Sequence, residues 1–170
     1  MKKLFPSYSD TKTWKGSIER EYNLNASEIK KLHSEIVERD KNTCQYCDFT
    51  SRKFLTVNPI DSDLQNHTRD NLVTVCPMCK LVLNADYGCL KESIVELYRE
   101  CRYSQNEVIK ITREMRKEGK TDEQIIRHLG LKQKVPFKRD RHYLGNLIAF
   151  VTSWKGSFGQ AEEALAHCYR

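Results

Sequence analysis

The sequence lacks any apolar run near the roughly 18 residues that a membrane-spanning helix requires. It also lacks an apolar stretch after Lys2 and Lys3, so no secretory signal or transit peptide is evident. We find no internal repeat and no low-complexity segment. Of the 170 residues, 39% are hydrophobic and 31% are charged. We therefore expect a soluble, cytoplasmic chain that forms one domain, or a small module with a helical extension.

The excess of positive charge is confined to one stretch. The net charge is +6, and the segment from Arg102 to Tyr143 holds 12 Lys or Arg residues against 6 Asp or Glu residues. A localised basic face can attract nucleic acid, an acidic protein partner or anionic headgroups, but a solvated helical face has the same composition. The candidate nucleic-acid- or partner-binding residues are Arg113, Arg116, Lys117, Lys120, Lys132, Lys134, Lys138, Arg139 and Arg141.

Seven cysteines are many for a chain without an export signal, and an odd number argues against a disulfide framework. Two C-x2-C pairs, Cys44 with Cys47 and Cys76 with Cys79, are separated by 28 residues. Such pairs predict a tetrahedral structural Zn²⁺ site with these four ligands, and the alternative is four free buried thiols. The other cysteines, Cys89, Cys101 and Cys168, are spaced like core positions of helices.

The segments around the paired cysteines predict an order of elements. An N-cap pattern at residues 25–28 predicts a helix over 26–39. A knuckle at 44–47, a strand ending at Val57, a polar loop over 61–70, a strand over 72–75 and a helix that starts at Cys76-Pro77 follow. This order is that of a treble clef, whose helix dipole would offset the negative charge of the thiolates. So small a module depends on its metal, which supplies on the order of 10 kcal/mol.

The second half is predicted to be helical. Apolar stripes at residues 90–101, 108–115, 143–151 and 161–168 favour four helices, and a capping box at 121–124 opens a short one that stops at Gly130. We therefore predict an α+β fold, in which a ββα four-cysteine zinc module is embedded in a mainly helical domain. The predicted division is an N-terminal arm at 1–24, a helix plus zinc module at 25–85 and a helical, basic region at 86–170.

The stretch from Arg39 through the pairs Cys44-Gln45-Tyr46-Cys47 and Cys76-Pro77-Met78-Cys79 resembles the zinc-containing HNH endonuclease motif. That family uses an Asp-His pair at a strand end, a later Asn that orients the His, and a metal-binding His after the second cysteine pair. Here Asn71 is retained, but Asn58-Pro59 replaces Asp-His and Lys80 replaces the last His. His67, in the polar loop, could swing in or simply be exposed. The resemblance therefore implies an HNH-like fold without nuclease chemistry.

A narrower pattern is similar to the IcmJ/DotN family. It comprises residues 43–49, Val57-Asn58, Asp61, Asp63, Asn66 and residues 71–76. That resemblance implies a zinc-binding, non-catalytic adaptor in a type IVB secretion or conjugation coupling complex, at the cytoplasmic face of the inner membrane beside a coupling ATPase. Residues 86–170 carry no part of the resemblance.

Three functions follow from these patterns. The first is the zinc-stabilised adaptor that binds other proteins. The second is a DNA- or RNA-binding regulator, since residues 109–137 could form a helix-turn-helix whose recognition helix begins near Gln133, although Pro136 argues against it unless it lies in the first turn. The alternative for this segment is a helical bundle with a basic outer face. The third is a divergent HNH endonuclease with the ligand set Asp61, Asp63, His67 and Asn71.

Overall fold

The first helix within the described residues covers one side of a two-stranded hairpin. The computed structural model describes residues 1–8, 26–63, 66 and 68–153, and helix α2 (Ala26–Arg39) confirms the predicted helix. Ile36 of α2 packs against Val57 and Leu72 of the hairpin in a small apolar cluster. The guanidinium of Arg39 donates to the backbone oxygens of Arg69 and Leu72, at 2.7 Å each, and so holds the end of α2 on the hairpin.

The hairpin and the following helix confirm the predicted order of elements around the cysteines. Strands β1 (Thr56–Pro59) and β2 (Leu72–Val75) are antiparallel, with Thr56 opposite Val75 and Pro59 opposite Leu72. A 3-10 turn, η2 (Arg69–Asn71), leads into β2. Helix α3 (Pro77–Leu83) starts with Pro77 in its first turn, where the missing N–H group of proline costs nothing.

The second half contains a three-stranded antiparallel sheet with the strand order β4-β3-β5. Its strands are β3 (Val95–Glu100), β4 (Lys132–Val135) and β5 (Ile148–Val151). The predicted helices over 90–101 and 143–151 are therefore wrong. Leu90, which shared the first stripe, is 61% exposed, and short apolar runs do not separate a central strand from a buried helix. The two apolar runs instead form the paired strands β3 and β5, in which Val95 lies opposite Val151.

Four other helical segments accompany this sheet. They are a π-turn, η3 (Tyr87–Lys91), and helices α4 (Gln105–Lys117), α5 (Asp122–Leu129) and α6 (Arg141–Gly145). The capping box of Thr121 and Gln124 is confirmed, as is the stop of α5 at Gly130, whose φ of 67° is the left-handed conformation that favours glycine. Strand β4 follows at once, so the recognition helix expected near Gln133 does not exist.

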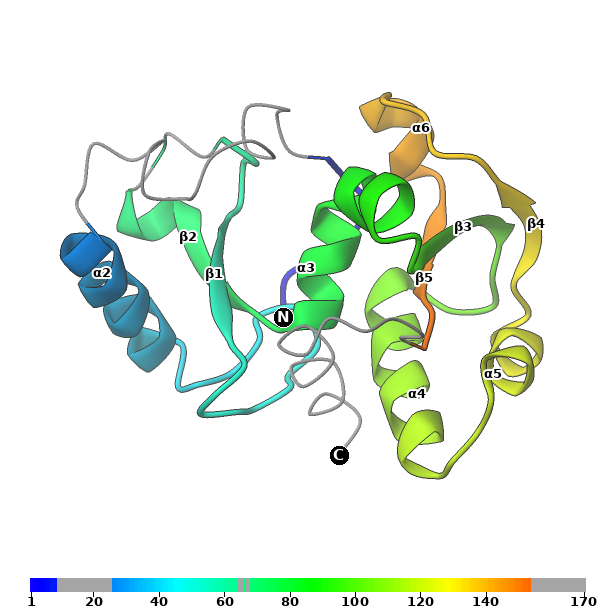
Figure 1. The fold of residues 1–170 in the computed structure, drawn as a ribbon, viewed down its shortest axis with the longest axis horizontal. Helices are drawn as coiled ribbons and strands as arrows, with labels where there is room; N and C mark the ends of the chain where they lie inside the picture. Colours follow the sequence, from blue (N-terminus) through cyan, green and yellow to red (C-terminus); the bar gives the residue numbers. More distant parts are fainter. Residues whose placement is uncertain (9–25, 64–65, 67, 154–170) are drawn as a thin grey trace.

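The two halves lie side by side, with α3 and α4 between the two sheets (Figure 1). Their inner surfaces share one apolar core, in which Val75 and Met78 meet Leu97 and Ala149. The fold is thus α+β, as predicted, but its second half is mixed rather than mainly helical. The predicted helix at 161–168 and most of the N-terminal arm lie outside the described residues.

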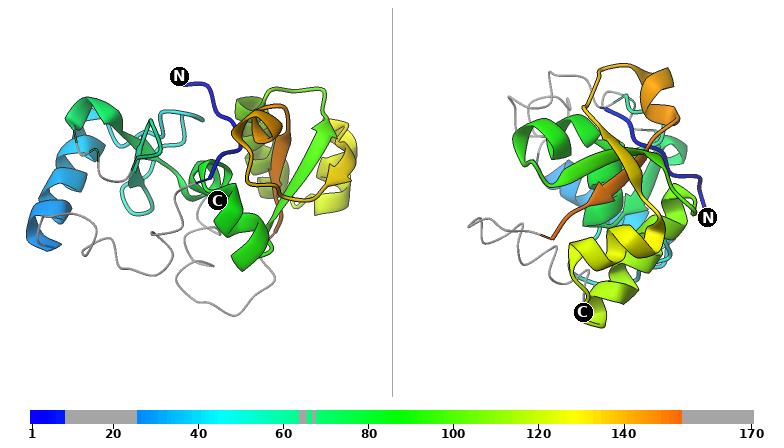
Figure 2. Two further views of the ribbon diagram at one scale, coloured as in Figure 1. Left: turned by 90° about the horizontal axis from the view of Figure 1, so that it is seen from above. Right: turned by 90° about the vertical axis from the view of Figure 1, so that its right-hand side faces the viewer.

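Two buried amide side chains hold the start of α4, Gln105 within the second half and Asn106 across to the first. Gln105 exchanges two hydrogen bonds with the backbone of Ala149, at 2.8 and 2.7 Å. Asn106 accepts from the backbone N–H of Leu4 at 3.0 Å and donates to the oxygen of Tyr46 at 2.6 Å. Residues 1–8 are therefore fixed between the cysteine module and α4 (Figure 2).

Candidate metal centre

The four paired cysteines come from two structural elements. Cys44 and Cys47 lie on a tight turn, in which the N–H of Asp48 donates to the Cys44 oxygen at 3.0 Å and the N–H of Cys44 donates to the Phe49 oxygen at 2.8 Å. Cys76 is the N-cap of α3 and Cys79 lies in its first turn. The hairpin folds back between them, and so brings the second pair to the first.

The four sulfur atoms form one buried cluster. All four Sγ atoms lie within 4.8 Å of one another, and those of Cys47 and Cys76 are 3.6 Å apart. Four sulfurs around one zinc ion, each about 2.3 Å from it, would be separated by about 3.8 Å. The cysteines are free thiols rather than disulfides. The spacing and the burial therefore fit one metal ion held by four sulfurs, which would leave no position for water or substrate.

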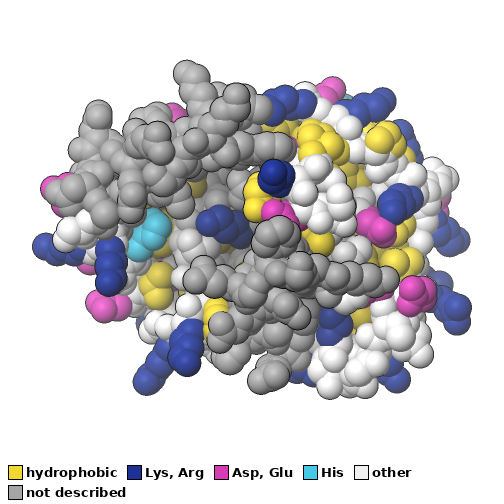
Figure 3. Space-filling model, viewed as in Figure 1, with side chains coloured by type: hydrophobic (Ala, Val, Ile, Leu, Met, Phe, Trp, Pro, Cys, Tyr) yellow, Lys and Arg dark blue, Asp and Glu magenta, His cyan; other side chains and the backbone are white. Residues whose placement is uncertain are grey.

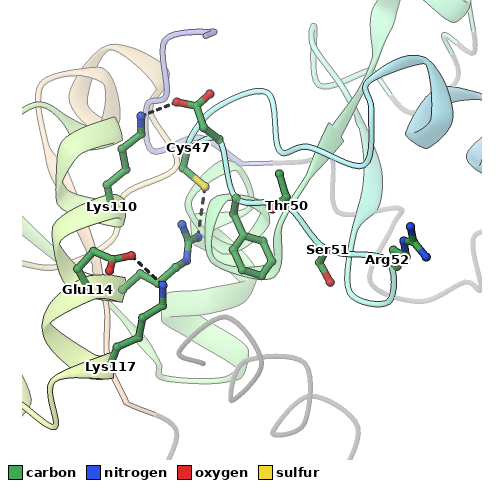
Figure 4. A pocket seen from close by; sticks show the side chains of 10 residues that line it. Cys47, Thr50, Ser51, Arg52, Lys110, Glu114 and Lys117 are labelled. Carbon is green, nitrogen blue, oxygen red and sulfur yellow. Dashed lines mark hydrogen bonds and ion pairs between the residues drawn. The ribbon is translucent and has the colours of Figure 1, made fainter.

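A buried arginine lies against this cluster. An Nη atom of Arg113, on α4, is 3.2 Å from Sγ of Cys47, a contact drawn as a dashed line in Figure 4. It is also 3.4 Å from Sγ of Cys76. Its guanidinium carbon lies 4.4 Å from the ring centroid of Phe49. Hydrogen bonds with the thiols of Cys44, Cys76 and Cys79, together with the charge of Arg113, lower the pKa of Cys47. Thiolate, the form that binds metal, is thus favoured at Cys47. Hydrogen bonds with Cys47 and Cys76 raise the pKa of Cys44, and burial raises the pKa of Cys79.

The residues at the positions compared with the HNH motif have other surroundings. The amide of Asn58 donates to the Pro59 oxygen at 3.0 Å. Burial lowers the pKa of Lys80, on α3. Burial, followed by the charge of Lys80, also lowers the pKa of His33, on α2. Sequence analysis did not identify His33 as a neighbour of Lys80, because the two residues are far apart in the sequence.

Asn71 holds the polar loop. Its amide nitrogen donates to a carboxylate oxygen of Asp61 and to the backbone oxygen of Asn66, at 2.9 Å each, and its amide oxygen accepts from the Asp61 N–H. Among the described residues, the four cysteines are the only cluster of three or more potential metal ligands. His67 lies outside them. Asp61 and Asp63 therefore do not complete a second metal site within the described part of the chain.

The nine candidate basic residues do not form one surface. Arg113 is 4% exposed, and Arg116 is buried in an ion pair with Asp122 at 2.7 Å and a hydrogen bond to the Val151 oxygen at 2.6 Å. These two arginines are structural, which corrects their assignment to a binding face. The exposed candidates are distributed over α4, β4, α6 and the turns beside them. On the face shown in Figure 3, basic side chains alternate with acidic ones.

An open pocket of about 780 Å³ lies between the cysteine knuckle and α4. Lys110 and Lys117 line it, paired with Asp48 and Glu114 at 2.5 and 2.9 Å (Figure 4). Cys47 and Arg113 also line the pocket. Arg52 also lines the pocket, so its four basic residues outnumber its two acidic ones and the lining has an excess of positive charge.

Comparison with known proteins gives a partial similarity. No protein-family model matches this chain. Over 51 residues, the chain is 38% identical to the type 4 apparatus protein DotN of Legionella pneumophila subsp. pneumophila (strain Philadelphia 1). This chain is similar to a segment of DotN. The match covers 30% of this chain and spans about a quarter, 24%, of the length of DotN. Among the described residues, no helix is both long and apolar enough to cross a membrane.

Proposed function

We propose that Cys44, Cys47, Cys76 and Cys79 hold one structural Zn²⁺ ion in a treble-clef, HNH-like module. The buried four-sulfur cluster supports this, because thiolates select zinc and a closed four-sulfur set is typical of structural sites. The ion would fasten the knuckle to the start of α3. The module would comprise residues 25–85, and residues 86–170 would form the basic region that distinguishes this chain.

The chain would act as a non-catalytic adaptor in a multiprotein machine related to type IV secretion or conjugation. The observation that carries this proposal is the similarity to DotN, which is named as a type 4 apparatus protein. Its partners would be other proteins of that machine. Its place would be the cytoplasm, at the inner face of the membrane that holds the machine.

The residues at the HNH positions support a role without catalysis. Pro59 has no group that can accept a proton, and the ammonium of Lys80 would repel a divalent cation. The amide of Asn71 is engaged by Asp61 and by the loop backbone. We expect no nicking of plasmid DNA with Mg²⁺ or Mn²⁺, and cleavage that disappears in Asn71→Ala or His67→Ala would instead support a nuclease.

An affinity purification from the native cells tests the adaptor role. The tagged full chain is recovered after nuclease treatment, and the retained proteins are identified by mass spectrometry, with a tag-only strain as the control. We expect a coupling ATPase and other secretion components among them. Retention of RNA polymerase instead, or of nothing once nucleic acid is digested, would contradict the proposal and support a nucleic-acid-binding regulator.

A further inference from the structure

Two arginines and an N-terminal tyrosine meet beside α6. The guanidinium carbons of Arg139 and Arg141 lie 4.7 and 5.0 Å from the ring centroid of Tyr8. Both arginines are exposed. Tyr8 is held in place by its neighbour Ser7, whose backbone N–H donates to the Val82 oxygen at 3.1 Å and whose oxygen accepts from the chain just after α3, at 2.8 Å. The N-terminal segment and α6 lie side by side in both views of Figure 2.

A second aromatic ring gathers two more cations. Nζ of Lys138 lies 5.2 Å from the ring centroid of Tyr143, and the guanidinium carbon of Arg99 lies 5.9 Å from it. The Tyr143 hydroxyl donates to the Pro136 oxygen at 2.8 Å, which fixes the ring. We call this group the tyrosine-cation surface. It consists of Tyr8, Arg99, Lys138, Arg139, Arg141 and Tyr143.

The tyrosine-cation surface has an excess of positive charge. The only carboxylate in residues 136–143 is Asp140, which caps α6 by accepting from the Tyr143 N–H at 3.0 Å. Among the described residues, no ion pair involves Arg99, Lys138 or Arg141. Lys134, on the neighbouring strand, differs because it pairs with Glu96 at 2.5 Å. Arg99, Lys138 and Arg141 therefore create a local positive field that attracts an anion.

The way in which these cations are held indicates the kind of anion. A guanidinium stacked on an aromatic ring keeps its N–H donors in the plane of the guanidinium, where they can hydrogen-bond to a carboxylate in bidentate fashion. Stacking also restricts the side chain before binding, which reduces the entropy lost on binding. Tyr8 and Tyr143 already contact cations of this chain, so neither ring is an open platform for a nucleic-acid base, which single-strand binding uses.

We propose that the tyrosine-cation surface binds an acidic peptide segment of a protein partner. This inference rests on the proposed role in a protein assembly, and it names the chemistry of the partner. Carboxylates of the partner would bind Arg139 and Arg141 above Tyr8, and Lys138 and Arg99 above Tyr143. The surface lies on the α6 side of the second half, the part of the chain that carries no resemblance to the IcmJ/DotN family.

Fluorescence anisotropy on the full-length protein tests the proposal. The probes are a labelled oligoglutamate peptide and a labelled oligothymidylate of equal formal charge, at the same ionic strength. We expect the protein to prefer the peptide, and Arg139→Glu/Arg141→Glu to weaken peptide binding about tenfold or more. Lys30→Glu/Lys31→Glu on α2, which makes the same change of charge at exposed positions, is the matched control and should retain peptide affinity within about twofold.

A second double variant tests the proposal even if the first variant folds poorly. Arg99→Glu/Lys138→Glu should weaken peptide binding as well, and circular dichroism verifies the fold of each variant. Equal losses in the control, unchanged binding in both surface variants, or preference for oligothymidylate would overturn the proposal, and the last result would assign the surface to nucleic acid. Because this assay contains no cellular proteins, its result is independent of the affinity purification, so failure of the adaptor role is recognised separately.

Discussion

The guanidinium of Arg113 lies 3.2 Å from the sulfur of Cys47, a residue 66 positions earlier in the chain. This contact links α4 to the candidate metal centre. A four-thiolate site with a divalent ion carries two net negative charges, and a buried cation beside it offsets part of that charge. The second half of the chain therefore contributes directly to the electrostatics of the cysteine module.

Replacing this arginine should weaken the metal centre. We expect Arg113→Leu to lower the free energy of unfolding by about 2 kcal/mol, because the sulfurs lose a charged donor, and to speed the release of zinc to a chelator. Arg113→Lys should restore only part of the stability and of the zinc retention, since lysine lacks the planar guanidinium with its several N–H donors. Lys117→Ala, an exposed change on the same helix, is the control. Unchanged zinc release in Arg113→Leu would mean that the contact does not support the site.

Removing a cysteine of the cluster should remove the metal. We expect one zinc per chain in the purified protein, measured by plasma mass spectrometry, and none in Cys44→Ser or Cys76→Ser, whose modules should unfold because metal binding supplies their folding energy. Cys101→Ser, outside the cluster, should retain the zinc. A Cys44→Ser protein with full stability would contradict the zinc hypothesis.

Acid should weaken the contact between α5 and the rest of the second half. Burial of Asp122 raises its pKa, but the N–H of Ser153 and the charge of Arg116 outweigh burial, so the pKa lies below its usual 3.8. A lowered pKa in the folded state gives stability that is present above pH 3.8 and is lost as the pH falls through the folded pKa. Urea unfolding should therefore show that Asp122→Asn destabilises the protein at neutral pH and much less near pH 2.

The matched control for that experiment is Asp70→Asn, at an exposed carboxylate. It should change stability little at either pH. If Asp122→Asn is equally destabilising at both pH values, then its effect comes from packing or from the cap of α5 rather than from the charge of the carboxylate.

The side chain of Gln105 should contribute substantially to the stability of the fold. We expect Gln105→Leu to lower the free energy of unfolding by about 2 to 3 kcal/mol, because it leaves the buried N–H and C=O of Ala149 without their partner. Gln133→Leu, at an exposed position of β4, is the comparison and should change stability by less than about 0.5 kcal/mol. Thermal or urea unfolding measures the free energy of unfolding of both variants. Equal losses of stability would show that the hydrogen bonds of Gln105 to Ala149 do not stabilise the protein.

Sequence patterns located the elements whose signals are local. The cysteine spacing identified the cluster, Pro77 marked the start of α3, and the pair Thr121 and Gln124 marked α5, because caps and short ligand spacings are set by neighbouring residues. The helices at 26–39 and 108–115 were found for the same reason, since a full apolar stripe determines them.

The patterns failed where partners distant in the chain decide the structure. Val95 and Val151 belong to strands because each run pairs with the other, which no local period reveals. Arg113 and Arg116 were assigned to a binding face because they lie in a basic segment, yet their partners, Cys47 and Val151, are far away in sequence. No local pattern predicts that the ring of Tyr8 lies against Arg139 either.

The amide of Asn106 has a consequence for the order in which this protein folds on the ribosome. Its partner Leu4 precedes it by 102 positions, whereas all four cysteines of the cluster have been synthesised once Cys79 is added. The sulfurs can therefore gather around an ion on the nascent chain before α4 exists. Leu4 can bond to Asn106 only after α4 has been synthesised, so this hydrogen bond forms later than the last cysteine of the cluster is made.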